Sequence, residues 1–152
     1  LMTIIKKNYV VIIGLPIQIL FLSVPNYAQG EPIYSSFDIR FEEGLRCYNS
    51  AKFNIAMGIF TKLSSEYPTC SKCNYYAGKS TGKLASQANW FKAAELARKT
   101  LKFFQKAYLL NPNDYEITRD LAEYYITAPK FLGGNQKKGG ALKKRALELK
   151  KP

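Results

Sequence analysis

Two glycines that lie 34 residues apart, Gly44 and Gly78, stand in segments whose neighbouring residues also repeat. The apolar and turn residues that follow the first glycine are Phe53, Ala56, Phe60, Leu63 and Pro68. The second segment closes with Phe104, Ala107 and Pro112, and the two prolines are 44 residues apart, so it carries about ten additional residues. A helical pattern with a period near 34 is typical of arrays of paired helices, in which each pair buries its apolar face against the next.

The composition allows a packed core and excludes several kinds of chemistry. The chain has 152 residues, 47% of them hydrophobic, with 11 tyrosines and 9 phenylalanines, which suits one compact domain. It contains no histidine, so histidine-based acid–base catalysis, histidine-activated nucleophiles and histidine-ligated zinc are ruled out. Glu42 and Glu43 are adjacent on a helix and point apart, so they make a poor catalytic pair. We predict no catalytic, cofactor-binding or metal-binding residues and expect a protein that is not an enzyme.

The first 28 residues have the pattern of an export signal. Lys6 and Lys7 precede an apolar run over residues 9–24, and Ala28 offers a small residue for cleavage. The run has 16 residues, fewer than the ~20 that a membrane-spanning helix needs. Asn26 is unfavourable three residues before the cut, so an uncleaved membrane anchor is the alternative. We expect a signal peptide over residues 1–28 and an exported protein.

The sequence of the remaining chain predicts a linker followed by helices. Residues 29–35 form the linker, and Ser35 with Asp38 forms a capping box at the first helix start. Apolar spacing and breakers predict helices near residues 37–48, 53–67, 71–84, 90–108, 117–125 and 142–149. Residues 85–89 are expected to form a loop that contains the additional residues of the second segment. Phe131 and Leu132 are expected to be buried beneath the loop in which they lie. Six helices in three antiparallel pairs make the domain all-α.

Three cysteines raise the question of a disulfide. Cys70 and Cys73 are close enough for a local disulfide or a redox site, and Cys47 pairs with either in the alternative arrangements. A thioredoxin-like motif needs a strand before its helix, and none is predicted here. We expect a structural disulfide or buried thiols ahead of redox chemistry, and redox chemistry ahead of metal binding.

The net charge of +12 is concentrated towards the C-terminus. The basic residues there, against the single Glu148, are Lys137, Lys138, Lys143, Lys144, Arg145, Lys150 and Lys151. A solvated basic helix face is the simpler interpretation, and binding to an anionic polymer or membrane surface is the alternative. No specific nucleic acid is expected.

The repeated residues resemble the units of tetratricopeptide repeat (TPR) proteins. Gly44, Phe53, Ala56, Phe60 and Pro68 match one unit closely. A second unit is matched by Phe104, Ala107 and Pro112, with Thr100 at a position where alanine is usual. A third unit is matched by Leu121, Ala122 and Tyr125. The stretch NPNDYEITRDLAEYYITAPKFLGG is similar to exported bacterial TPR proteins with a proline and Gly-Gly insertion in their third unit. The resemblance covers units at about residues 36–69, 70–113 and 114–150. Glu43 and Gly139 depart from the pattern, as does the lengthened second unit.

The resemblance implies a function in binding other proteins. In this family the first helix of each pair lines a concave groove, which would make the chain a non-enzymatic scaffold of the bacterial cell envelope, periplasmic or secreted, or else membrane-anchored. The implied groove residues are Phe41, Leu45, Tyr48, Asn49, Lys72, Tyr75, Lys79, Lys83, Glu116, Arg119, Glu123 and Ile126. Apolar anchors beside charged clamps suit an extended peptide or a partner helix. In the alternative, the apolar members belong to the core and the lysines are merely solvated. Three units are near the minimum for stability, so self-association is also expected.

Overall fold

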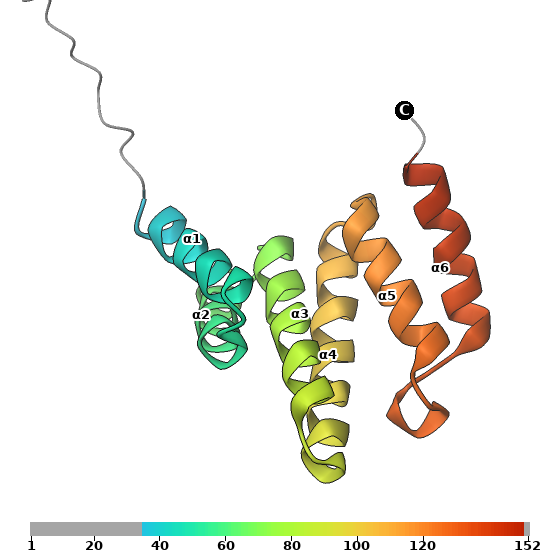
Figure 1. The fold of residues 1–152 in the computed structure, drawn as a ribbon. Helices are drawn as coiled ribbons and strands as arrows, with labels where there is room; N and C mark the ends of the chain where they lie inside the picture. The colour runs from blue at the N-terminus through green and yellow to red at the C-terminus, as the bar shows by residue number, and fades with distance from the viewer. Residues whose placement is uncertain (1–34, 151–152) are drawn as a thin grey trace, which may run out of the picture. The chain divides into compact units, whose positions relative to one another are not determined.

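The computed structural model describes residues 35–150, and within them every regular element is helical (Figure 1). The α-helices are α1 (Ser36–Asn49), α2 (Phe53–Glu66), α3 (Ser71–Gln87), α4 (Trp90–Leu110), α5 (Tyr115–Thr127) and α6 (Gln136–Leu149), and a 3₁₀-helix, η1 (Lys130–Leu132), precedes α6. The prediction of an all-α fold is confirmed for this part of the chain. The predicted signal peptide and linker residues 29–34 lie outside the described residues. None of the described helices combines the length and the hydropathy needed to cross a bilayer.

Side chains just before the helices determine where they begin. The predicted capping box is present, because the Asp38 backbone N–H donates to Ser35 Oγ at 3.2 Å while Ser35 N–H donates to Asp38 Oδ2 at 3.0 Å. Asn89, Asp114 and Asn135 cap α4, α5 and α6 by accepting from the backbone N–H three residues ahead. Each cap satisfies a donor that the first helical turn leaves without a partner.

Successive helices pack against one another, and the repeated glycines mark two equivalent contacts. Contacts join α1 to α2, α2 to α3, α3 to α4, α4 to α5 and α5 to α6. A Cβ atom placed on Gly44 would lie 2.7 Å from Phe60 Cζ, and one on Gly78 would lie 2.6 Å from Phe104 Cδ1. In both pairs the first helix therefore approaches a buried phenylalanine so closely that no side chain fits between them.

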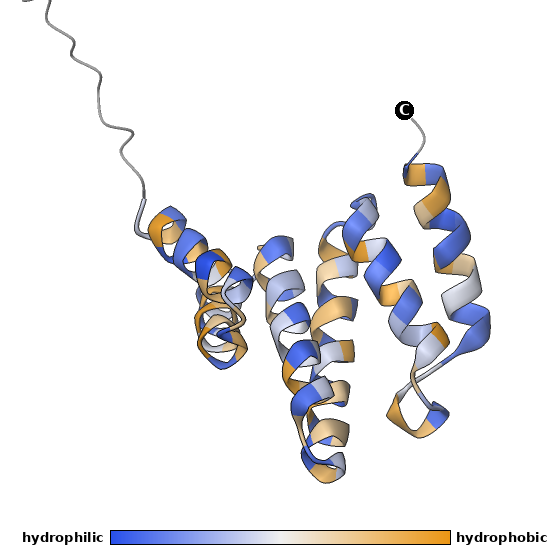
Figure 2. Cartoon of the chain, in the orientation of Figure 1, coloured by the Kyte–Doolittle hydropathy of each residue, from blue (hydrophilic) through white to orange (hydrophobic). Residues whose placement is uncertain are grey.

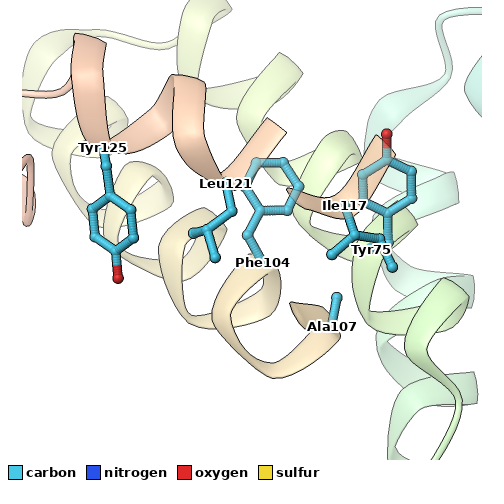
Figure 3. Packing of buried hydrophobic residues seen from close by; sticks show 6 residues of the cluster. All are labelled: Tyr75, Phe104, Ala107, Ile117, Leu121 and Tyr125. Atoms are coloured by element: carbon cyan, nitrogen blue, oxygen red, sulfur yellow. The ribbon is translucent and has the colours of Figure 1, made fainter. Parts of the chain in front are cut away.

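The apolar side chains gather into two clusters. The first lies among α1, α2 and α3 and consists of Ala56, Phe60, Leu63, Cys73 and Ala77. The second lies among α3, α4 and α5 and is formed by Tyr75, Phe104, Ala107, Ile117, Leu121 and Tyr125 (Figure 3). Tyr76 packs against both clusters. The first two pairs thus complete their cores by contact with the first helix of the next pair.

The prediction that residues 85–89 form an inserted loop is wrong. Helix α3 continues to Gln87, and α4 begins at Trp90. Helix α3 has 17 residues against 14 in α1, and α4 has 21 against 14 in α2, which accounts for the additional residues. Leu84, Ala85 and Gln87 are good helix formers, and Asn89 then caps the next helix, so the insertion lengthens both helices instead of opening a loop.

The connection from α5 to α6 also differs from prediction at one residue. Leu132 is half-buried, but Phe131 is exposed and does not tuck beneath the loop. The Tyr124 hydroxyl lies 2.9 Å from the Leu132 carbonyl oxygen and 2.8 Å from the Ala97 carbonyl oxygen, which holds η1 against α4 through its backbone.

Candidate functional site

Three tyrosines and one lysine from α1 and α3 form the most distinctive polar group of the described chain. The Lys79 Nζ atom lies 5.3 Å from the ring centroid of Tyr48, 5.2 Å from that of Tyr75 and 5.7 Å from that of Tyr76. The faces of aromatic rings attract cations at such distances. We call these four residues the tyrosine–lysine cluster. It includes three of the predicted groove residues, and Tyr76 is an addition.

Helix α5 holds one side of this cluster through a carboxylate. The Tyr75 hydroxyl donates to Asp120 Oδ2 at 2.7 Å, and Arg119 Nη2 lies 2.7 Å from Asp120 Oδ1. Burial, followed by the Asp120 hydrogen bond, raises the pKa of Tyr75, and burial followed by the Asp120 charge raises the pKa of Tyr48. Both hydroxyls therefore stay protonated at neutral pH, so they can donate hydrogen bonds but cannot serve as general bases.

Lys72 is committed to contacts within the chain. Its Nζ atom lies 2.9 Å from Asp114 Oδ2 and 3.2 Å from Glu116 Oε2. Burial lowers the pKa of Lys72, but the hydrogen bonds to the two carboxylates outweigh burial and raise it. Lys72 and Glu116 therefore link α3 to α5 through opposite charges, and their predicted role as groove clamps stays a prediction.

The predicted apolar anchors lie within or beside the core. Tyr75 is fully buried, so it supports the site from beneath and cannot touch a partner directly. Phe41 and Leu45 are half-buried and pack on the first cluster, with the Phe41 ring centroid 5.4 Å from that of Phe60. These positions match the alternative interpretation, in which the apolar members belong to the core. Asn49 and Lys83 remain exposed.

The predicted groove residues of the third unit are divided between two places. Arg119 supports Asp120, whereas Glu123 and Ile126 line a separate cavity of about 380 Å³ between α5 and α6, which Arg119 also borders. A Cβ atom on Gly139 would lie 2.6 Å from Ile126 Cγ1. Ile126 therefore packs over Gly139 of α6, because the missing side chain there allows the two helices to approach closely.

The cysteines are not part of the tyrosine–lysine cluster, but they pack in the same hydrophobic cluster as Tyr48 and Tyr76. A disulfide joins Cys70 and Cys73 at the start of α3, with an S–S distance of 2.10 Å and a Cα–Cα distance of 5.4 Å. Cys47 is a free, half-buried thiol beside the first cluster. The disulfide follows the turn after α2, and residues 35–150 hold no strand to precede it. The same residues contain no group of three potential metal-ligating side chains.

Tyr76, Asp114 and Asp120 complete the site but are not among the groove residues predicted from the sequence. Asp120 occupies the position in the third unit that Tyr76 occupies in the second, 44 residues earlier. Extending the repeat register to every position of α5 would have placed this carboxylate opposite α3. The burial of the Tyr75 side chain, in contrast, could not be predicted from the repeat spacing. Tyr75 is covered by residues that follow it by more than 25 positions, such as Phe104 and Asp120.

No model of a known protein family matches this chain, and no curated protein matches it either. The function proposed below therefore rests on the residues and geometry of the chain itself.

Proposed function

We propose that residues 36–150 form a TPR-like solenoid of three helix pairs that acts as a non-enzymatic protein–protein interaction module. The 34-residue spacing, the equivalent glycine–phenylalanine contacts and the sequential packing of the helices support this proposal. The N-terminal pattern supports export to the bacterial cell envelope, as a periplasmic, secreted or membrane-anchored protein.

The tyrosine–lysine cluster is the main observation that supports this proposal. Among the described residues, no carboxylate lies within salt-bridge distance of Lys79 or of Lys83. Lys83 lies one helical turn beyond Lys79 on α3. Two unpaired ammonium groups on one face suit an acidic side chain or a terminal carboxylate of a peptide. Tyr48 of α1 lies beside Lys79, and the exposed Asn49 follows it in the chain.

Contacts between α3 and α5 would hold the site in its binding geometry. Tyr75, Asp120 and Arg119 are linked by short hydrogen bonds, and Lys72 bridges α3 to α5. Contacts of this kind reduce the ordering that a partner must otherwise induce. We therefore assign recognition to Tyr48, Asn49, Lys79 and Lys83. We assign positioning to the residues that link α3 to α5, which are Lys72, Tyr75, Arg119 and Asp120.

An array of acidic peptides tests this proposal. The variant with Lys79→Glu and Lys83→Glu should bind at least about tenfold more weakly than the unmodified chain, because charge-assisted hydrogen bonds contribute ~1.5–3 kcal/mol each. The matched control is Lys62→Glu with Lys106→Glu, which changes the net charge equally at exposed positions on α2 and α4. Equal weakening in both variants would contradict a specific site.

The surface of α6 supports a second candidate, binding to anionic polymers. Lys137, Lys143 and Lys144 are exposed, and none of them forms an ion pair with a described residue. Ala146 on the same helix is buried, so removing α6 would disturb the fold. Replacing Lys137 and Lys144 by glutamine is the better test. It should reduce binding to heparin and its dependence on salt, and unchanged binding would exclude this surface.

A further inference from the structure

The lengthened α3–α4 pair ends in exposed aromatic side chains. Trp90 is 65% exposed and Phe91 76%, and their ring centroids lie 4.8 Å apart. Phe131 of η1 is 63% exposed. In Figure 1 the turn from α3 to α4 lies at the lower end of the view, and Figure 2 shows hydrophobic colouring in lower α4 and in the α5–α6 connection. We call Trp90, Phe91 and Phe131 the aromatic tip.

Two of the three aromatic-tip residues line one apolar cavity. Trp90 and Phe131 line a cavity of about 310 Å³ together with Leu132, Ser86 and four alanines, which are Ala85, Ala93, Ala94 and Ala97. The contact between α4 and η1 brings the two segments together. Exposed aromatic residues scattered singly need no explanation, but a group that borders a shared apolar cavity indicates a binding surface.

The charges close to the aromatic tip in the sequence are mostly positive. Residues 84–99 and 128–134 carry four basic side chains, Lys92, Arg98, Lys99 and Lys130, and one carboxylate, Glu95. Glu95 lies between two of them, 2.8 Å from Lys92 Nζ and 2.7 Å from Lys99 Nζ. The surroundings of the exposed rings are therefore cationic.

We propose that the aromatic tip docks on the surface of an anionic lipid bilayer. Tryptophan and phenylalanine rings favour the boundary between headgroups and acyl chains, and nearby lysines are attracted to anionic headgroups. The tip lies at the end of a helix pair that is longer than its neighbour α1–α2. A flat surface can reach such an end without displacing the helices. This surface is separate from the tyrosine–lysine cluster and leaves that cluster free for a protein.

Trp90 is the only tryptophan of the chain, so its fluorescence reports on the aromatic tip alone. The full chain is mixed with vesicles of phosphatidylcholine, with or without phosphatidylglycerol, and with lipids brominated on their acyl chains. The apolar residues 9–24 can attach the chain to vesicles by themselves. This attachment does not change the fluorescence of Trp90 unless the aromatic tip also enters the bilayer. We expect a blue shift and quenching of Trp90 on the anionic vesicles, both weakened by high salt.

Two variants make the test specific. Phe91→Ser with Phe131→Ser should weaken the fluorescence response by about tenfold or more, while Leu109→Ser, at a 79% exposed position near the other end of α4, should leave it unchanged. Circular dichroism checks that both remain helical. The proposal is overturned if Trp90 emission stays unshifted and unquenched with anionic vesicles. It is also overturned if neutral vesicles give the same response, or if Trp90 responds to an envelope protein but to no vesicle.

Discussion

The absence of a side chain at Gly44 sets the distance between α1 and the buried Phe60 ring. Gly44→Ala should lower the free energy of unfolding by about 1–3 kcal/mol, because the added methyl group displaces a fully buried ring. Gly58→Ala is the control, since a Cβ there has no atom within 4 Å, and alanine should raise helix stability by ~0.5–1 kcal/mol. Urea denaturation measures both changes, and destabilisation by both variants alike would argue against the close contact.

Ala51 has a backbone conformation that favours glycine. Its φ of 57° lies in the left-handed region, in the turn between α1 and α2. Ala51→Gly removes the steric cost of the Cβ atom but increases the entropy of the unfolded chain, so a net stabilisation of up to about 1 kcal/mol is expected. Thermal unfolding measures the effect, and a lower melting temperature would contradict this backbone geometry.

Among the helices, α5 depends most clearly on one residue before its start. Asp114 accepts from the Ile117 backbone N–H at 3.1 Å and pairs with Lys72 at 2.9 Å. Asp114→Asn keeps a cap and loses the ion pair, which should cost ~0.5–1 kcal/mol because Lys72 is partly exposed. Asp114→Ala should cost ~1 kcal/mol more, since it also loses the cap. Equal stability of the two variants by urea denaturation would show that the cap contributes nothing.

The same carboxylate predicts a pH dependence. Burial raises the pKa of Asp114, but the hydrogen bonds from Lys72 and from the Ile117 backbone outweigh it and lower the pKa below the ordinary value of 3.8. Because the pKa of Asp114 is lower in the folded state, its ionised carboxylate increases the free energy of unfolding at pH values above 3.8. This contribution is lost as the pH falls from 3.8 towards the pKa of the folded state. The acid limb of a stability profile should therefore be shallower for Asp114→Asn than for the unmodified chain. Parallel profiles would contradict the ion pair.

The Cys70–Cys73 disulfide should contribute modestly to stability. It closes a very short loop, so its reduction is expected to cost no more than ~2 kcal/mol. Cys70→Ser keeps a residue that caps α3 well and should make stability insensitive to a reducing agent. Denaturation with and without reductant measures this, and a reductant effect that persists in the variant would indicate a disulfide between the remaining Cys47 and Cys73.

The number and order of helices could be predicted from the sequence, whereas the shape of the second pair could not. Pro68, Pro112 and the capping residues end and start helices locally, so the periodic apolar residues between them suffice. Residues 84–87 continue α3 because helix propensity and packing outweigh the expectation that an insertion forms a loop. The candidate site was predicted in part. Lys79 and Lys83 follow from the repeat register, but the burial of Tyr75 depends on contacts between pairs that no local pattern contains.

At the scale of the whole molecule, the last helix pair leaves a surface without a following helix among the described residues. The cavity between α5 and α6 is bordered by the exposed Leu147, by Ala122 and Ala146, and by the charged side chains of Arg119, Glu123 and Lys143. We predict concentration-dependent self-association through this cavity, measurable by light scattering, and reduced by Leu147→Ser. A constant monomer mass over a wide concentration range would contradict it.

The central claim is that the face bearing Lys79 and Lys83 binds another protein. Affinity capture from envelope extract of the source organism tests it most directly, with three baits in parallel: the chain without its first 28 residues, Lys79→Glu with Lys83→Glu, and Lys62→Glu with Lys106→Glu. We predict at least one partner that the first and third baits retain and the second loses. If all three retain the same proteins, or if the two variants lose them equally, the tyrosine–lysine cluster is not the binding site.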